Sequence, residues 1–332
     1  MTDRNLRDLT LVLPTCNRSA LLARFLDYVR ACGFEMPILI ADGSQYDQAR
    51  ANTEAIACCA DGLDVHYRHF APEIMVGQRI GLALESVATT YTLFCADDDF
   101  VFLPKVREAV MRLETEPDCV ACGGPMIVYT GNSANGPSIR VHVAHDVTGM
   151  TSLQRIDAHM VQYRPTFYSV YRTAAAWAAF AHGRQPFDYW PRLVELSASA
   201  AVVAQGNYRA LDGFFGMREM HPAQESKTGG QWMDIILHRD FSTHLEAAAA
   251  HAARIVLEHE EMPFETALNA IKLAFLRFVH VTYGPTLRGT PVREVPERHA
   301  AQRAALAPVL QAPPAEIAAA LRAVGALPSV AS

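Results

Sequence analysis

The sequence of 332 residues contains no run of about 18 to 20 apolar residues, the length that a membrane-spanning helix needs. The first residues, Met1 to Asp8, are polar and lead directly into a short apolar segment, so they lack the apolar core of a secretory signal. These two absences predict a soluble, cytoplasmic protein. They leave a peripheral membrane contact open.

The sequence also lacks an excess of basic charge and a regular cysteine framework. Its net charge is -6 at pH 7, whereas proteins that bind nucleic acid usually carry a basic patch. The seven cysteines are odd in number and irregularly spaced, which is typical of reduced thiols. Cys119 and Cys122 form a CxxC pair without a second pair at zinc spacing, so we interpret both as core residues. The composition argues against a nucleic acid partner and a disulfide scaffold.

Two phosphate-binding motifs are missing after the first apolar segment, Leu9–Leu13. A dehydrogenase would carry Gly-x-Gly-x-x-Gly there, and the chain has Pro14 to Arg18 instead, without any glycine. A nucleotidyltransferase usually offers a glycine- and lysine-rich loop, yet the first lysine of the chain is Lys105. The dehydrogenase hypothesis is therefore poor, and a nucleotidyltransferase stays only as an alternative.

The chain does contain a regular alternation of short strands and amphipathic helices up to residue 128. Half of all residues are hydrophobic, which is enough for one large core. The expected strands are Leu9–Leu13, Pro37–Ala41, Leu63–Phe70, Tyr91–Ala96 and Cys119–Val128. The expected helices are Ser19–Cys32, Gln45–Cys59, Val76–Ala88 and Pro104–Leu113. This alternation predicts an α/β fold with a mainly parallel central sheet flanked by helices on both faces.

Three polar segments follow three of these strands. They are Thr15–Arg18, Asp42–Ser44 and Asp97–Asp99. Ligands of such folds bind beyond the carboxyl ends of the parallel strands. We therefore expect the three segments to surround one crevice.

The triplet Asp97–Asp99 is the segment with the clearest chemical meaning. Three adjacent carboxylates repel one another, and holding them together usually requires a cation or ligand hydroxyls. Oxygen-rich sites suit Mg2+ or Mn2+, which complete their coordination with water and substrate phosphates. The triplet therefore predicts a divalent metal and phosphate chemistry.

The pattern becomes less regular after residue 129. Thr130–Gly149 is rich in Gly, Asn and Ser and is expected to be a loop or hairpin. Phe167–Ala179 and Leu193–Ala204 are expected to be helices. From about Phe241 the composition becomes alanine-rich with apolar residues at helical spacing, which predicts a helical C-terminal region over residues 241–332.

These segments resemble a known family. The runs Leu11–Arg18, Ile38–Ser44, Gly77–Gly81 and Phe94–Asp99 are similar, in order and spacing, to the nucleotide-sugar-binding half of inverting family 2 glycosyltransferases with a GT-A fold. The resemblance covers residues 1–125 well and is weaker up to Glu225. It implies a GT-A catalytic domain over residues 1–240, with a nucleotide-sugar-binding half at 1–125 and an acceptor half at 126–240.

The resemblance implies roles for residues around the nucleotide. The expected nucleotide-binding residues are Pro14, Thr15, Asn17, Asp42, Arg79, Asp97 and Asp98. Asp42 matches the aspartate that contacts the base in the family. The family's frequent Asp-Asp-Gly-Ser starts here with Ala41, so one acidic position is missing.

The resemblance also implies a metal site. The triplet matches the DXD motif, in which Asp97 and Asp99 would bind Mn2+ or Mg2+. Metal sites of this fold often take a late histidine, and His221 is our choice. Its neighbour Arg218 is expected to pair with a phosphate or with Glu219.

The implied reaction is transfer of a sugar from a nucleotide-sugar donor, expected to be UDP-linked, to an acceptor hydroxyl with inversion. A carboxylate base must take the proton of the acceptor, and the candidates are Glu195, which we favour, and Asp188. The Gln-x-x-Arg-Trp motif of processive synthases is absent, because Gln231-Trp232 lacks the arginine, so we expect a non-processive enzyme.

Several questions stay open at this point. The acceptor is unidentified, and a surface-glycan precursor, a small molecule and a protein all fit. A homo-oligomer is compatible with the sequence. A noncatalytic nucleotide-sugar-binding scaffold is the alternative from another class, and replacing Glu195 would leave such a protein unaffected.

Overall fold

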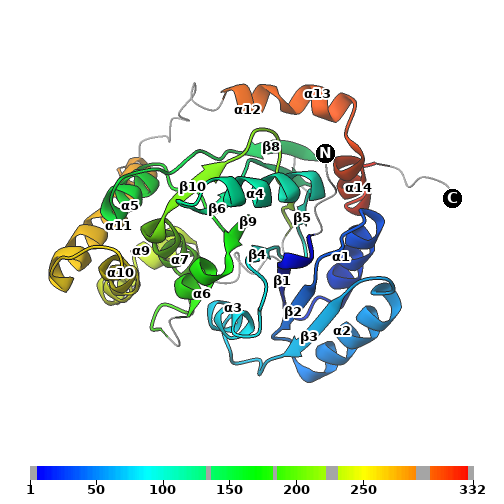
Figure 1. Cartoon of the computed structure of the whole chain (residues 1–332), viewed down its shortest axis with the longest axis horizontal. Coiled ribbons are helices and arrows are strands. Elements are labelled where there is room, and N and C mark those ends of the chain that lie inside the picture. The colour runs from blue at the N-terminus through cyan, green and yellow to red at the C-terminus, as the bar shows by residue number, and fades with distance from the viewer. Residues whose placement is uncertain (1–5, 132–135, 182–184, 222–230, 289–299, 328–332) are drawn as a thin grey trace.

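The computed structural model of the chain describes residues 6–131, 136–181, 185–221, 231–288 and 300–327. A central sheet has helices on both of its faces (Figure 1). The blue and cyan elements of the first third lie side by side at one end, and the yellow and orange helices α10 and α11 lie at the other (Figure 1). This arrangement is the α/β fold with a helical C-terminal region that the sequence predicts.

The larger sheet has seven strands in the order β10-β6-β9-β4-β1-β2-β3. Only β9 runs antiparallel to its neighbours, β4 and β6. The other pairs are parallel, so most strands end at the same edge of the sheet. The strands are β1 (Leu9–Thr15), β2 (Ile38–Asp42), β3 (Val65–His69), β4 (Tyr91–Phe94), β6 (Cys119–Gly123), β9 (Ser169–Arg172) and β10 (Asn207–Ala210).

A smaller sheet of four strands, in the order β5-β11-β7-β8, lies beside it. Its strands are β5 (Phe100–Val101), β7 (Met126–Thr130), β8 (Ser138–His142) and β11 (Gly216–Glu219). β5 directly follows the aspartate triplet and pairs antiparallel with β11. The smaller sheet therefore brings residues near 218 back to the triplet, from about 120 positions later in the chain.

The alternation of side chains along the buried strand β1 creates two cores. Leu11 and Leu13 belong to one hydrophobic cluster, and Val12 belongs to the other. Helices α1 (Ser19–Ala31) and α4 (Leu103–Thr115) contribute to the cluster of Leu11. The other helices of this part are α2 (Tyr46–Cys59), α3 (Val76–Leu84), α5 (Ser152–Val161), α6 (Thr173–Phe180) and α7 (Pro191–Gln205).

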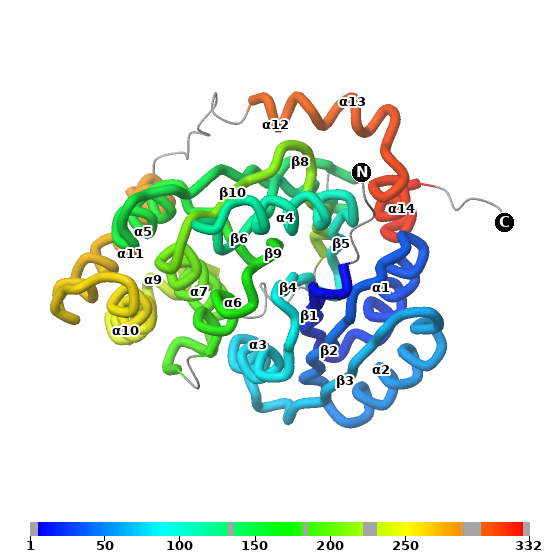
Figure 2. The backbone as a smooth tube through the Cα atoms, viewed as in Figure 1, coloured from blue at the N-terminus to red at the C-terminus, as the bar shows by residue number. Residues whose placement is uncertain are grey.

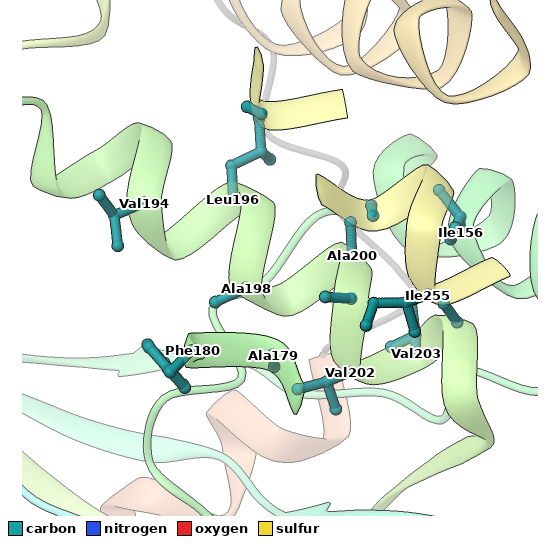
Figure 3. Packing of buried hydrophobic residues seen from close by; sticks show 14 of the residues in the cluster. Ile156, Ala179, Phe180, Val194, Leu196, Ala198, Ala200, Val202, Val203 and Ile255 are labelled. Carbon is teal, nitrogen blue, oxygen red and sulfur yellow. The ribbon is translucent and has the colours of Figure 1, made fainter. Parts of the chain in front are cut away.

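Helix α7 is the centre of the second core. Figure 3 shows its residues from Val194 to Val203 packed with Ile156 of α5 and Ile255 of α10. Ser197 donates a hydrogen bond to the carbonyl of Ala248 in α10 over 3.1 Å, because the small side chains let the two helices approach closely. The position of α7 is therefore determined by helices on several sides.

The C-terminal helices cover two separate parts of the molecule. α10 and α11 pack on α7 and α5, whereas α14 packs on α1 at the other end (Figure 2). A short 3-10 helix, η1 (Leu6–Asp8), precedes β1. The helices of this region are α9 (Trp232–Ile236), α10 (Phe241–Leu257), α11 (Phe264–Leu287), α12 (Ala300–Ala304), α13 (Leu306–Gln311) and α14 (Ala315–Ala323).

Two predicted elements are wrong. The expected strand Cys119–Val128 is divided into β6 and β7, which lie in different sheets, because Gly124 and Pro125 interrupt the strand and proline cannot donate a ladder hydrogen bond. The expected helix Phe167–Ala179 begins as strand β9 and becomes helix α6 only at Thr173. The short segment Ser169–Arg172 pairs with β4 on one side and β6 on the other. These sheet contacts outweigh the helical spacing of its apolar residues.

The region Thr130–Gly149 contains strand β8, paired antiparallel with β7, as expected for a hairpin; residues 132–135 lie outside the described part. All seven cysteines are free thiols, and both members of the CxxC pair are buried. Within the described ranges, no single helix has the length and apolar composition to cross a membrane. One pair, Ala300–Gln311 and Ala315–Ala323, bent by 81°, meets that test jointly by length and composition alone.

Candidate active site

Three polar loops meet at the carboxyl edge of the larger sheet. β1 lies between β2 and β4, and Thr15 is paired in register with Asp42. The loops after these three strands carry Cys16–Arg18, Gly43–Ser44 and Asp97–Asp99. The expectation that the three segments lie together is therefore confirmed for the backbone.

The first two aspartates of the triplet are buried and bound to Thr15 at the end of β1, to Arg18 in the loop after it and to His221. Thr15 donates its hydroxyl to Oδ2 of Asp97 over 2.6 Å. Arg18 lies between the two carboxylates, with Nη1 3.2 Å from Oδ1 of Asp97 and 3.1 Å from Oδ2 of Asp98. Nε2 of His221 lies 2.9 Å from Oδ2 of Asp98. The negative charge of Asp97 and Asp98 is therefore balanced by residues from two distant parts of the chain, Arg18 and His221.

The third aspartate, Asp99, is bound from the smaller sheet. Its carboxylate accepts hydrogen bonds from the Tyr168 hydroxyl, from Nε of Arg218 over 3.3 Å and from the backbone N–H of Glu219 over 2.8 Å. Arg24 in turn forms an ion pair of 2.7 Å with Glu219. We expected Arg218 to pair with a phosphate or with Glu219. In the structure Glu219 pairs with Arg24, and Arg218 pairs with Asp99.

The pKa values of Asp98 and Asp99 are shifted in opposite directions. Burial and the neighbouring Asp98 carboxylate raise the pKa of Asp99 to about 7, although Arg218 acts in the other direction. Burial also opposes ionisation of Asp98, but the hydrogen bond of His221 and the charge of Arg18 outweigh it and lower its pKa. Such crowded carboxylates favour binding of a cation.

A cavity of about 160 Å³ opens beside the triplet. Its polar wall contains the three aspartates, Thr15, Arg18 and Arg218. Its apolar wall comes from α3, α6 and α7 and includes Ile80, Phe180 and Val194. Glu195 of α7 also lines this cavity, so the structure places one isolated carboxylate on the wall of the chamber that contains the triplet.

The environment of Glu195 makes it a stronger base than an exposed glutamate. Burial raises its pKa, while the charge of Arg218 and a hydrogen bond from the Tyr163 hydroxyl over 3.3 Å act in the opposite direction. A carboxylate with a raised pKa accepts a proton more readily near neutral pH. Glu195 is therefore a buried carboxylate of raised pKa on the wall of the cavity.

Comparison with known protein families shows the family of the chain. The model of Glycosyl transferase family 2 matches residues 10–180, which is more than half of the chain. The chain belongs to glycosyl transferase family 2. This protein is accordingly a glycosyltransferase. No curated protein sequence matches it significantly.

Solved structures show the fold of this glycosyltransferase. S. aureus TarS 1-349 in complex with UDP-GlcNAc has a TM-score of 0.52 at 14% identity, and the match covers 92% of this chain and 81% of that one. A second structure of S. aureus TarS has a TM-score of 0.51 at 15% identity and covers 94% of this chain, which spans only 50% of that protein. At these identities the likeness establishes the fold alone.

The second candidate base of this glycosyltransferase lies elsewhere. Asp188 is buried and accepts a hydrogen bond from the backbone N–H of Gln185 over 2.6 Å, which closes a tight turn before α7. Unlike Glu195, it does not line the cavity. The structure therefore brings Glu195, but not Asp188, to the aspartate triplet.

Asp42 organises the loop after β2. It accepts hydrogen bonds from the backbone N–H of Ser44, from Asn52 and from the Tyr67 hydroxyl, at 2.8, 2.8 and 2.6 Å. Asn17, with φ of 56°, ties this loop to the loop after β1, since its backbone N–H donates to Oγ of Ser44 over 2.6 Å. Asn17 and Asp42 thus both maintain the loop geometry, and Pro14 and Thr15 reach the cavity directly.

Arg79 of α3 is buried against the same loop. A Cβ atom at Gly43 would lie 1.5 Å from Nη1 of Arg79, so only glycine leaves room for this guanidinium. Its Nε has no hydrogen-bond partner among the described residues. A buried arginine with an unused donor, packed on the loop after β2, is suited to an anionic group.

No role was assigned from the sequence to two residues of the site. Arg18 was included only as part of the segment Thr15–Arg18, and its position three residues after the end of β1 was a usable signal. Tyr168 had no such signal, because it precedes the strand β9 that we expected to be helix. Both bind carboxylates of the triplet, and both line the cavity.

Proposed function

We propose that this protein transfers a sugar from a UDP-linked donor to an acceptor hydroxyl, with inversion and without processive extension. The observation that carries the proposal is the cavity, where the aspartate triplet, Arg18 and Glu195 converge. Inversion by direct displacement needs a base and a stabilised leaving group at one reacting centre. The triplet region and Glu195 supply these two functions.

The aspartate triplet fits a hard divalent ion, Mg2+ or Mn2+. Its donors are carboxylate oxygens, and the raised pKa of Asp99 reflects a crowd of negative charge that a cation would relieve. Asp97, Asp99 and His221 would hold the ion, and the contact of His221 adds Asp98 to this set. A bound ion would neutralise the charge that develops on the diphosphate leaving group.

The residues of the chain perform the remaining steps. Arg18 and Arg79 offer guanidinium groups to the phosphates of the donor, and Arg18 already balances two carboxylates on the cavity wall. Glu195 accepts the proton of the acceptor hydroxyl as that oxygen attacks the anomeric carbon. The apolar wall of α3, α6 and α7 excludes water from the donor, which limits hydrolysis.

The choice of UDP has two supports. The loops that match the family carry Asp42 at the position that contacts the base in that family. The structure of S. aureus TarS 1-349 contains UDP-GlcNAc, and it shares the fold of this chain. GDP-linked sugars are the competing donor class in the test below.

The test combines binding with turnover. We expect calorimetry to show UDP binding that requires Mn2+, is weaker for GDP and is lost in Asp99→Ala. UDP-sugar hydrolysis or transfer should then fall by about 10²- to 10⁴-fold in Glu195→Gln, while UDP binding is retained. Asp188→Asn serves as the matched carboxylate control.

The outcomes separate the alternatives. Unchanged turnover in Glu195→Gln would refute its role as base. Nucleotide binding without any turnover across UDP- and GDP-sugars would favour the noncatalytic scaffold. Release of diphosphate from a nucleoside triphosphate would favour a nucleotidyltransferase.

A further inference from the structure

A second group of metal-ligating side chains lies at the turn between α9 and α10. His238 and Asp240 belong to this turn, and His244 lies in the first part of α10. One ligand atom of each residue lies within 4.8 Å of the corresponding atoms of the other two. None of the three lines the cavity of the aspartate triplet. The group is therefore a separate cluster, which we call the histidine cluster.

The backbone already fixes the spacing of the histidine cluster. The N–H of Asp240 donates to Nδ1 of His238 over 3.2 Å, and the N–H of His244 donates to the carbonyl of Asp240 over 3.0 Å. The two imidazole rings have centroids 5.6 Å apart. Little backbone ordering would therefore be needed to bring the three side chains around one ion.

The cluster also contains a ring nitrogen that makes no hydrogen bond to the described residues. Nδ1 of His244 is buried and has no hydrogen-bond partner within the described residues. The Asp240 carboxylate lies 3.9 Å from Nδ1 of His238, and its nearest cation is the exposed Arg239 at 3.4 Å, a weak contact in water. An ion would satisfy the buried nitrogen and replace a contact of little strength.

We propose that His238, Asp240 and His244 form a second metal site that takes a borderline divalent ion such as Zn2+. Two imidazoles and one carboxylate are typical zinc ligands, whereas the oxygen-rich triplet suits Mg2+ or Mn2+. Zinc ligands lie about 2.1 Å from the metal, so neighbouring donors in a tetrahedral site are about 3.4 Å apart. Small side-chain rotations would close the present spacing to that value.

The place of the cluster gives the ion a structural role near the active site. The ring of His238 packs edge-on against Trp190, with centroids 5.5 Å apart. Trp190 directly precedes α7, the helix that carries Glu195. Arg192 of α7 also donates to the side chain of Gln231, just before α9, over 3.0 Å. A bound ion therefore stabilises the turn between α9 and α10 in its contact with Trp190, at the start of α7.

The experiment uses the full chain without a histidine tag, after treatment with a chelator. Calorimetry should show one equivalent of Zn2+ bound, with affinity at least about tenfold weaker in His244→Ala and in the exposed, conservative Asp240→Asn. His66→Ala is the control, because His66 contacts a single carboxylate, Asp64, on the surface. It should bind Zn2+ like the wild type.

A spectroscopic readout places the ion. Cu2+ bound beside His238 should quench the fluorescence of Trp190, and Trp190→Phe should lose this quenching while it keeps Zn2+ binding. Zn2+ should also raise the Tm of the wild type but not of His244→Ala. The proposal is overturned if the wild type binds no Zn2+, if both cluster variants bind it normally, or if Asp97→Asn rather than the cluster variants abolishes binding.

Discussion

Two acidic sites at strand ends on either side of β1 stabilise their charge in different ways. Asp42, the last residue of β2, is surrounded by neutral donors: a backbone N–H, an amide and a hydroxyl. The triplet follows β4, which is separated from β2 by β1. Its charge is balanced by the cations Arg18 and Arg218 and by His221. Neutral donors build a fixed turn, whereas an arrangement of opposing charges can change when another charged group binds.

The largest effect is expected from a substitution that removes a charge from the aspartate triplet. Asp97→Asn keeps the shape of the side chain but removes one charge from the triplet, so Mn2+-dependent UDP binding should weaken by about 100-fold. The Tm should change little, because relief of repulsion among the carboxylates offsets the weakened contact with Arg18. Calorimetry and thermal unfolding on the same samples measure both. A large drop in Tm would show that Asp97 is chiefly structural.

The reverse effect is expected at the neutral site. Asp42→Ala removes the charged acceptor of Asn52 and Tyr67 and leaves them the weaker contacts with Oγ of Ser44 at 3.1 Å and the carbonyl of Ala49 at 3.4 Å. This loss should lower the free energy of unfolding by about 3 kcal/mol. Denaturant unfolding measures this change. A loss of UDP binding without loss of stability would instead assign Asp42 to the nucleotide alone.

A smaller effect tests the link between the Asp42 turn and bound anions. Gly43→Ala should displace the Arg79 guanidinium and weaken UDP binding by about tenfold, or 1.4 kcal/mol. Arg79→Met should have the same effect, and the double variant should be no worse than either single one. Additive losses would show that Gly43 acts independently of Arg79.

The smallest effect concerns pH. Because the pKa of Asp99 is raised to about 7 in the folded state, its contribution to stability is complete below about pH 4 and is lost as the pH rises through 7. The metal-free wild type should therefore lose stability relative to Asp99→Asn across this range, and saturating Mg2+ should cancel the difference. An equal pH dependence of both proteins would contradict the shift.

A buried histidine should give the opposite slope. Burial lowers the pKa of His159 to about 3, so the folded protein excludes the proton that the unfolded chain accepts. Stability from His159 is complete above about pH 6.5 and falls as the pH drops toward 3. His159→Phe should unfold with a weaker pH dependence over this interval.

The arrangement of much of residues 1–128 could be predicted from residue patterns. β1, β2 and β4 follow from apolar runs that end in polar turns, and parallel connections put those ends at one edge. The strand β9 was not readable, because four residues with mixed propensity are decided by the sheet that receives them. Tyr168, which binds Asp99, was missed for the same reason.

Local chemistry was enough to place the aspartate triplet, because strand ends, glycine turns and runs of like charge are properties of neighbouring residues. It could not choose between Glu195 and Asp188, which lie seven positions apart in one acidic and aromatic stretch. The packing of α7 against α5, α6 and α10 turned Glu195 into the cavity, and the turn at Gln185 held Asp188 outside it. Such a choice depends on contacts between segments far apart in the chain, so only the folded molecule makes it.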